Sequence, residues 1–236
     1  MHPLLFSLKK RYNKEKLPDP FAYLFKWFGR TPTGVFQVGA NSGQEIKGFI
    51  EQGIKAGILV EPLPSAYKEL EKRASSQPGY FTVKAVCTDV AGKTCNFYVS
   101  KGGGGSSSLL KPSGHLVAHP EVDFDSAPIT LVSTTVDQIA ADFKTNGHAD
   151  MVARIDLLYI DTQGAELRVL KGANAFLKQV RYVFTEVSNS GLYENDVSHK
   201  ELTEYLDSHG FSLVFLYINK TRWGDALYVH NSIFDA

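Results

Sequence analysis

Three carboxylates and one glycine-rich turn stand at the ends of apolar runs in this chain. The turn, residues 39–43 (GANSG), directly follows the run Val35–Val38, and later runs end at Glu61, Asp161 and Glu186. Parallel strands place their carboxyl ends along one edge of a sheet, and open α/β sheets bind ligands beyond that edge. A single acidic strand end is ordinary, but three beside a glycine turn predict a binding site on that rim.

The glycine turn has two possible roles. Gly39 and Gly43 can adopt positive φ, and neither carries a Cβ that would keep a ligand from the backbone. Short glycine turns also connect strands to helices where no ligand binds. The turn alone leaves both readings open, and the residues that follow it favour a ligand.

The spacing of Glu61 favours a nucleoside ligand. Glu61 lies 22 residues after Gly39, where a carboxylate can accept hydrogen bonds from both hydroxyls of a ribose. A dinucleotide fingerprint needs glycine at the first, third and sixth positions, but Asn41 and Gln44 occupy the last two. The turn also carries no basic residue for a pyrophosphate. This spacing suits S-adenosylmethionine better than NAD.

Alternating apolar and amphipathic segments predict an α/β domain with a mostly parallel sheet and helices on both faces. The closing hairpin makes its last strand antiparallel. The expected strands are Val35–Val38, Gly57–Val60, Tyr80–Val86, Lys93–Ser100, Ile129–Ser133, Ile155–Ile160, Tyr182–Phe184, Phe211–Ile218 and Ala226–His230. The expected helices are Gln44–Gln52, Pro64–Ser75, Thr135–Phe143, Ala165–Leu177 and His199–His209. Aromatic spacing before residue 33 predicts an N-terminal helical cap over residues 1–32, ahead of one domain over 33–236.

Composition narrows the range of partners. The chain has 236 residues, 43% of them hydrophobic, with 25 basic and 25 acidic side chains. This neutral balance argues against nucleic acid and against an anionic membrane surface. No apolar run reaches the length of a membrane span. Cys87 and Cys95 are expected to be reduced thiols in a cytoplasmic protein.

A glycine- and serine-rich segment, residues 101–108, interrupts the domain. Its composition is that of a flexible linker, yet it lies between a predicted strand and Leu109. The segment through residue 114 is therefore either passively flexible or a mobile loop that orders over a ligand.

With these features in place, the chain resembles the FkbM family of S-adenosylmethionine-dependent methyltransferases from about residue 33 to 230. No single piece is specific, but the pieces occur in the family's order. They are VGANSGQ at 38–44, VEPLP at 60–64, FYVS at 97–100 with SSLL at 107–110, IDTQGAEL at 160–167 with VLKG at 169–172, Glu186-Val187 and Gly210-Phe211.

The resemblance implies a Rossmann-like class I methyltransferase fold with a seven-stranded sheet and S-adenosyl-L-methionine as cofactor. It implies that the methionine part of the cofactor contacts the glycine turn and that Glu61 holds the ribose. Asp161 and Gln163 would face the transferred methyl group. The implied cofactor residues are Gly39, Ala40, Asn41, Gly43, Glu61, Ala85, Val86, Asp161 and Gln163, with Cys87 nearby.

Two positions depart from the family pattern. The family usually places an acid two residues before the first glycine, where this chain has Gln37. It often has lysine two residues before the aspartate of the fourth strand, where Tyr159 stands.

The expected reaction is methyl transfer to an oxygen, with Asp161 as the first candidate for general base and Glu186 as the second. Three histidines could serve instead: His115, His119 and His199. Two carboxylates are too few to predict a metal ion. The resemblance implies a small acceptor with a hydroxyl group, such as a sugar, a glycolipid or a polyketide-like metabolite. Tyr98, Tyr193 and the glycine-serine segment could form its pocket.

Two alternatives belong to other functional classes. A nucleoside-binding module without catalytic activity would share the predicted rim, and Gln37 is the residue that raises this alternative. An NAD-dependent oxidoreductase would need the dinucleotide fingerprint that this turn breaks.

Overall fold

The computed structural model describes residues 32–234. Their centre is a seven-stranded sheet in the order β3-β2-β1-β7-β8-β10-β9, in which β10 alone runs antiparallel to its neighbours. The strands are β1 (Gly34–Val38), β2 (Ala56–Val60), β3 (Tyr80–Val83), β7 (Leu157–Ile160), β8 (Tyr182–Ser188), β9 (Phe211–Ile218) and β10 (Trp223–His230). The predicted mostly parallel sheet with an antiparallel closing strand is confirmed.

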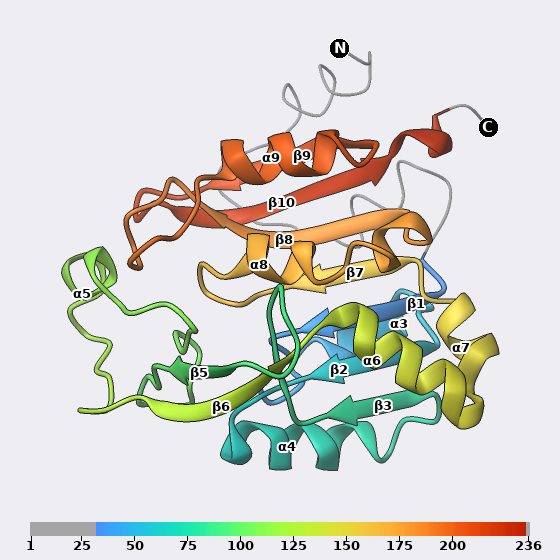
Figure 1. Ribbon diagram of the computed structural model, residues 1–236, viewed down its shortest axis with the longest axis horizontal. Helices are drawn as coiled ribbons and strands as arrows, with labels where there is room; N and C mark the ends of the chain where they lie inside the picture. Colours follow the sequence, from blue (N-terminus) through green and yellow to red (C-terminus); the bar gives the residue numbers. More distant parts are fainter. Residues whose placement is uncertain (1–31, 235–236) are drawn as a thin grey trace.

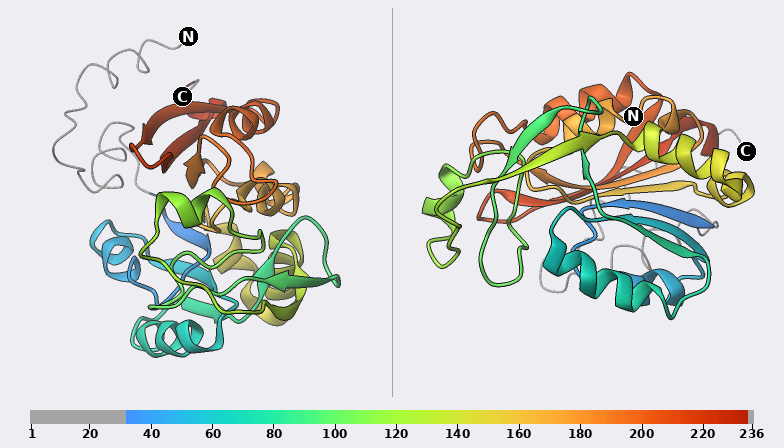
Figure 2. Two further views of the ribbon diagram at one scale, coloured as in Figure 1. Left: turned by 90° about the vertical axis from the view of Figure 1, so that its left-hand side faces the viewer. Right: turned by 60° about the horizontal axis from the view of Figure 1, so that its bottom comes forward.

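Helices cover both faces of this sheet (Figure 2). The α-helices are α3 (Ile46–Glu51), α4 (Pro64–Ala74), α5 (Gly114–Ala118), α6 (Val136–Phe143), α7 (Ala149–Ala153), α8 (Glu166–Lys171) and α9 (His199–Asp207). Shorter helical turns are η1 (Lys144–His148), η2 (Phe176–Lys178) and η3 (Asn231–Ile233). The predicted cap over residues 1–32 lies outside the described residues, apart from residue 32 itself.

Two apolar clusters explain why the sequences of the central strands are continuous hydrophobic runs. Alternate residues of β1 point to opposite faces: Val35 packs with Phe49 of α3 and Leu70 of α4, whereas Phe36 packs with residues of α6 and α8. Both sets are almost fully buried. A strand enclosed on both faces loses the polar alternation of a half-exposed strand.

A smaller sheet lies beside the carboxyl ends of the main one. Its strands are β4 (Val86–Cys87), β6 (Ile129–Thr134) and β5 (Thr94–Phe97), in that order. The predicted strand Tyr80–Val86 is thus divided, because β3 pairs with β2 whereas Val86 and Cys87 pair with β6. The segment between β5 and β6, which carries α5, extends to one end of the molecule (Figure 1).

Further predicted boundaries differ from the structure, and β10 begins at Trp223, three residues before the predicted Ala226. The fifth core strand does not end at Glu186: β8 continues to Ser188 because β10 pairs with it, opposing Glu186 with Asp225. The helix predicted to run to Leu177 ends at Lys171. A Cβ on Gly172 would lie 2.1 Å from the Thr88 carbonyl oxygen, so the chain turns there against a neighbouring segment.

Candidate active site

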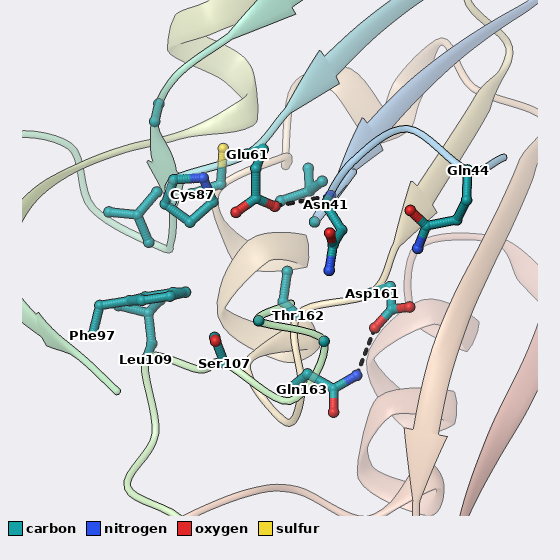
Figure 3. A pocket seen from close by; sticks show the side chains of 17 residues that line it. Asn41, Gln44, Glu61, Cys87, Phe97, Ser107, Leu109, Asp161, Thr162 and Gln163 are labelled. Atoms are coloured by element: carbon teal, nitrogen blue, oxygen red, sulfur yellow. Dashed lines mark hydrogen bonds between the residues drawn. The ribbon is translucent and has the colours of Figure 1, made fainter. Parts of the chain in front are cut away.

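A cavity opens where β1, β2 and β7 end, and we call it the inner cavity. It encloses about 650 Å³ including its mouth. Figure 3 shows Phe97, Leu109 and Cys87 toward one end, Asn41, Gln44 and Asp161 toward the other, and Glu61 between them. Of the nine predicted cofactor residues, seven line this cavity: Gly39, Asn41, Glu61, Ala85, Val86, Asp161 and Gln163.

The glycine turn brings the ends of three strands together. The backbone N–H groups of Gly39 and Ala40 both donate to the Val60 carbonyl, each at 3.0 Å. Gly39 has φ +85°, and a Cβ there would lie only 1.8 Å from the backbone oxygen of Asp161. Glycine is therefore required for the close approach of the ends of β1 and β7.

Ala40 and Gly43 do not line the inner cavity. Ala40 is fully buried and packs in the apolar cluster under α3 and α4. A Cβ on Gly43 would lie 2.8 Å from side-chain atoms of Ile46 and Leu70. The structure thus gives both residues a packing role in the turn.

Asn41 adopts the left-handed backbone conformation, with φ +43°. Asparagine tolerates this conformation better than most residues. Its backbone N–H donates to Glu61 Oε2 at 2.9 Å, and its side-chain Nδ2 donates to the Gly103 carbonyl at 3.3 Å. Asn41 therefore connects the glycine turn both to β2 and to the glycine-serine segment.

Glu61 is buried, and both of its carboxylate oxygens are oriented by backbone groups. Oε2 accepts from Asn41, and Oε1 accepts from the Leu63 N–H at 2.9 Å. Burial raises the pKa of Glu61 to about 7, against these hydrogen bonds, which lower it. Each oxygen retains acceptor capacity for a further donor, such as a ribose hydroxyl.

Residues 161–166 form a second turn at the edge of the sheet where the parallel strands end. Gln163 has φ +56°, and its Nε2 donates to Asp161 Oδ1 at 2.8 Å and makes a short contact with Glu186 Oε2. Glu166 holds this turn by accepting from Thr162 N and Gly164 N, at 3.0 and 3.1 Å. The amide of Gln163 therefore bridges two carboxyl groups, which explains its fixed orientation.

Asp161 and Glu186 are close together, because both of their carboxyl groups contact the side-chain amide of Gln163. Burial raises the pKa of Glu186 well above its ordinary value, and the adjacent charge of Asp161 raises it further. Two carboxyl groups that contact the same Gln163 amide retain a proton between them, because two negative charges at short range repel each other. We assign that proton to Glu186, the carboxyl whose pKa is raised.

A second hollow, the outer cavity, lies on the other side of this pair and encloses about 760 Å³ including its mouth. It shares three lining residues with the inner cavity: Gly105, Asp161 and Gln163. The rest of its wall consists of Ser106, His115, His119, Val122, Glu186, Leu192, Trp223 and Asp225. Sequence reasoning missed Trp223 and Asp225, because they belong to a hairpin strand with no recognisable motif.

The glycine-serine segment closes one side of both cavities. Tyr98 and Ser108 exchange two backbone hydrogen bonds at its base, and Ser100 N donates to Ser107 Oγ at 2.9 Å. Ser108 Oγ also donates to the Gln163 carbonyl at 2.7 Å. In this structure the segment is tied to the rim, and Gly104, Gly105 and Ser107 line the inner cavity.

Tyr193 secures the same segment from the opposite side. Its hydroxyl lies 2.9 Å from the Ser106 carbonyl oxygen and 3.3 Å from Gln163 Oε1. Tyr193 is buried and so supports the wall between the two cavities. Tyr98 contributes through its backbone pairing, and it lines neither cavity.

The two departures from the family pattern lie together behind the glycine turn. Gln37 and Tyr159 are neighbours in the pairing of β1 with β7, and both are buried. Gln37 Nε2 donates to Glu45 Oε2 at 3.2 Å, while its Oε1 has no hydrogen-bond partner among the described residues. The carboxylate of Glu45, the residue before α3, therefore lies beside Gln37, where the family usually has an acid.

The three candidate histidines occupy different environments. His115 and His119 line the outer cavity, whereas His199 begins α9 and lines neither cavity. Within residues 32–234, no group of three or more His, Cys, Asp and Glu side chains is arranged to hold a metal ion. Over the same residues, no helix is both long enough and apolar enough to cross a membrane.

The inner cavity fits the three parts of S-adenosylmethionine. Its apolar end, with Val86, Phe97 and Leu109, suits a flat adenine. Glu61 stands in the middle, where a ribose diol needs acceptors, and the polar end at Asn41 and Gln44 suits an amino acid. The Asp161 carboxyl group lies at the junction of the two cavities.

Comparison with known proteins identifies the family of this chain. The Methyltransferase FkbM domain matches residues 37–213. A curated relative, 2-O-methyltransferase NoeI of Sinorhizobium fredii, is 27% identical over 187 residues, covering 76% of this chain and 72% of that protein.

A comparison with solved structures finds magnesium protoporphyrin IX methyltransferase of Synechocystis PCC 6803 with bound SAM. It has a TM-score of 0.47 and 11% identity, over 95% of this chain and 90% of that one. A SAM-dependent methyltransferase of Aquifex aeolicus has a TM-score of 0.47 and 10% identity, over 95% and 97%. The chain has a Rossmann-like methyltransferase fold, uses S-adenosylmethionine as its cofactor, and belongs to the FkbM family of methyltransferases.

Proposed function

We propose that this methyltransferase transfers its methyl group to a hydroxyl oxygen of a small acceptor, such as a sugar, a glycolipid or a polyketide-like metabolite. One observation carries the proposal: the inner and outer cavities share Asp161, Gln163 and Gly105. A cofactor in the first cavity and an acceptor in the second would therefore meet at a carboxylate. The name of the curated relative, a 2-O-methyltransferase, supports oxygen as the methylated atom.

The inner cavity would bind the cofactor through groups that the fold already orients. Glu61 would accept from the ribose hydroxyls, because its two oxygens are held by Asn41 and Leu63. Ala85 and Val86 would flank the adenine, and Asn41 would lie along the methionine part. Gly39 would contribute indirectly, because its missing Cβ allows the Asp161 backbone to approach the glycine turn.

The cofactor supplies a methyl group on a sulfonium, which is a good leaving group. The protein's main task is to hold the acceptor oxygen in line, and such alignment can be worth ~7–11 kcal/mol of barrier. Asp161 would take the hydroxyl proton as the new C–O bond forms, and a positioned base typically adds ~10²–10⁴-fold. Glu186, which we assign as protonated, would keep Asp161 in place through their shared contact with Gln163.

The proton-transfer role is tested by Asp161→Asn. The probe is a panel of methyl glycosides with S-adenosylmethionine labelled in its methyl group. We expect turnover at saturating substrates to fall ~10²–10⁴-fold, while calorimetric affinity for S-adenosylhomocysteine changes little. Unchanged turnover would remove Asp161 from this role.

Asp142→Asn is the matched control. Asp142 accepts from the Gln138 amide at 2.8 Å, the same contact that Asp161 makes with Gln163, but it lies exposed on α6. It should leave turnover unchanged. Cofactor binding by the wild-type protein without transfer to any hydroxyl would instead favour a nucleoside-binding module without catalytic activity.

A further inference from the structure

The glycine-serine segment has a fixed base and an exposed tip. Its base is buried at three serines: Ser100, Ser107 and Ser108. Its tip, residues 102–105, consists of glycine and is largely exposed. Three of these glycines adopt positive φ, from +72° to +107°, where most other residues would be strained. We call residues 101–106 the lid, since a glycine tip on a fixed base can open as a unit.

Hydrogen bonds within the segment keep the two ends of the lid together. Ser106 N donates to Ser100 Oγ at 3.0 Å, and Ser100 N donates to Ser107 Oγ at 2.9 Å. Ser107 N also donates to the Gly104 carbonyl at 3.0 Å, which closes a tight turn. These bonds are internal to the segment, so they do not depend on whether the lid is open or closed.

The tip of the lid contacts both residues that orient Glu61. Asn41 Nδ2 donates to the Gly103 carbonyl at 3.3 Å. A Cβ on Gly104 would lie 2.7 Å from Leu63 Cδ1, so the tip lies directly against that side chain. The backbone N–H groups of the same two residues, Asn41 and Leu63, each hold the Glu61 carboxylate at 2.9 Å. The lid and the carboxylate proposed to bind the ribose therefore depend on the same two residues.

The lid also forms part of the wall between the two cavities. Gly104 and Gly105 line the inner cavity, and Gly105 and Ser106 line the outer cavity. The Ser106 carbonyl accepts from the Tyr193 hydroxyl, which lies 3.3 Å from Gln163 Oε1. Opening of the lid would therefore alter both cavities at once.

Asn41 is suited to couple the lid to a ligand, because its two donor groups hold different parts of the site. Its backbone N–H holds Glu61, and its side-chain amide holds Gly103. A ligand that fixes the Glu61 carboxylate also fixes the Asn41 backbone, and so restricts the side chain that holds the lid. Such coupling is reciprocal, so the closed lid also favours the bound ligand.

We propose that Asn41 is a positioning residue that couples the cofactor to the lid. Bound cofactor fixes Glu61 and Asn41, the Asn41 amide holds the lid closed, and the closed lid slows release of the cofactor. The closed lid also supplies Gly105 to the wall that both cavities share. This proposal rests on the ribose position given under the proposed function, and it is independent of the group that the enzyme methylates.

Asn41→Gly tests this role, because glycine keeps the backbone N–H and adopts positive φ without strain but removes the side-chain amide. Hydrogen exchange followed by mass spectrometry measures the lid amides with and without saturating S-adenosylhomocysteine. In the wild-type protein, we expect this ligand to slow their exchange about tenfold or more. In Asn41→Gly, this protection ratio should fall about 3–10-fold, the effect of one hydrogen bond. S-adenosylhomocysteine should also dissociate about 3–10-fold faster.

The protection ratio separates coupling from simple support. If Asn41 only held the lid in place, its loss would speed exchange equally with and without the ligand, and the ratio would not change. Saturation keeps every protein fully bound, so a weaker affinity alone does not change the ratio either.

Asn195→Gly is the matched control. Asn195 also adopts positive φ, at +61° against +43° for Asn41, but it is exposed and lines neither cavity. It should leave both the protection ratio and the dissociation rate unchanged. Binding of S-adenosylhomocysteine by both variants shows that they fold.

The outcomes decide the role of Asn41 without an acceptor. A fall in the protection ratio that is confined to Asn41→Gly supports the coupling. An unchanged ratio in Asn41→Gly, or a lid that the ligand does not protect in the wild-type protein, would overturn it. Either of these results leaves hydroxyl methylation standing, since failure of that function is seen separately as the absence of transfer to any hydroxyl.

Discussion

The inner and outer cavities share a wall but are built in different ways. The polar end of the inner cavity comes from strand ends, where the register of the parallel sheet places Gly39, Glu61 and Asp161 side by side. The outer cavity takes most of its wall from loops and from the start of β10, including His115, Leu192 and Trp223. Strand pairing therefore determines the first cavity, and contacts between distant loops determine the second.

This difference predicts which substitutions affect which ligand. A change at a strand end should disturb the sheet and the cofactor together, since the same backbone groups serve both. A change in the outer cavity should affect the acceptor while the cofactor still binds.

The largest effect should come from Gly39→Ala. Its Cβ would lie 1.8 Å from the Asp161 backbone oxygen, so β1 and β7 would have to separate at the rim. We expect the free energy of unfolding to fall by about 3–5 kcal/mol, with loss of S-adenosylhomocysteine binding. Urea denaturation and calorimetry measure the two effects.

Gly53→Ala is the control for that substitution. Gly53 has φ +82°, close to the value at Gly39, but a Cβ there would meet no atom within 4 Å. It should cost only the left-handed backbone strain of ~1–2 kcal/mol and leave binding intact. Equal losses in the two variants would contradict the role assigned to the contact with Asp161.

The next effect concerns pH and the outer cavity. Burial, and then the charge of Asp161, raises the pKa of Asp225 to about 7. A carboxyl group whose pKa is raised on folding stabilises the folded state at pH values below its unfolded pKa, near 4. This stabilisation is lost as the pH rises through 7. Between pH 5 and 8, Asp225→Asn should therefore lose less stability than the wild-type protein, by on the order of 2–3 kcal/mol.

Urea denaturation of the cofactor-free protein across this range measures the difference. Asp123→Asn is the control of opposite sign, because the Lys101 ion pair lowers the pKa of Asp123. The control should be less stable than the wild-type protein by a constant amount between pH 5 and 8, where Asp123 is charged, and this difference should disappear only in acid. A pH profile of Asp225→Asn parallel to that of the wild-type protein would refute the assigned burial of this carboxyl.

A smaller effect is expected from Glu61→Gln. Glutamine can accept one of the two backbone N–H groups but would present its own N–H₂ to the other. We expect calorimetric affinity for S-adenosylhomocysteine to fall about 10–100-fold. Glu51→Gln, an exposed change on α3 beside Lys47, should leave affinity unchanged; equal affinities in all three proteins would exclude Glu61 from the ribose site.

The smallest effect is expected from Tyr193→Phe, which removes the hydroxyl between Ser106 and Gln163. The loss should be about 1 kcal/mol of stability, with faster amide hydrogen exchange in residues 101–108. Tyr98→Phe is the control, because no hydrogen bond of its hydroxyl to a described residue is present. Identical exchange in both variants would mean that Tyr193 does not hold the segment.

The sequence predicted the inner cavity well, because its determinants are local. Apolar runs ending at Glu61 and Asp161 mark buried parallel strands, and the glycine turn marks the start of the rim. Three details depended on remote backbone contacts that no local pattern records. These are the packing of Ala40 and Gly43 away from the cavity, the continuation of β8 past Glu186, and the break after β3.

Most of the outer cavity could not be predicted from the sequence, because it too depends on contacts between segments that are far apart in the chain. His115 was one of three candidate histidines, and only its contact with the segment around Leu192 distinguishes it from His199. Trp223 and Asp225 reach the cavity through pairing of β10 with β8. The glycine-serine segment had a composition that allowed either flexibility or closure, and its serine hydrogen bonds are visible only in the folded chain.

A crystal structure of the complex with S-adenosylhomocysteine would test this account most directly. It should show both ribose hydroxyls within hydrogen-bond distance of the Glu61 carboxylate, with the sulfur directed at the junction formed by Asp161 and Gln163. A nucleoside bound elsewhere, or a Glu61 carboxylate that contacts only Asn41 and Leu63, would contradict it.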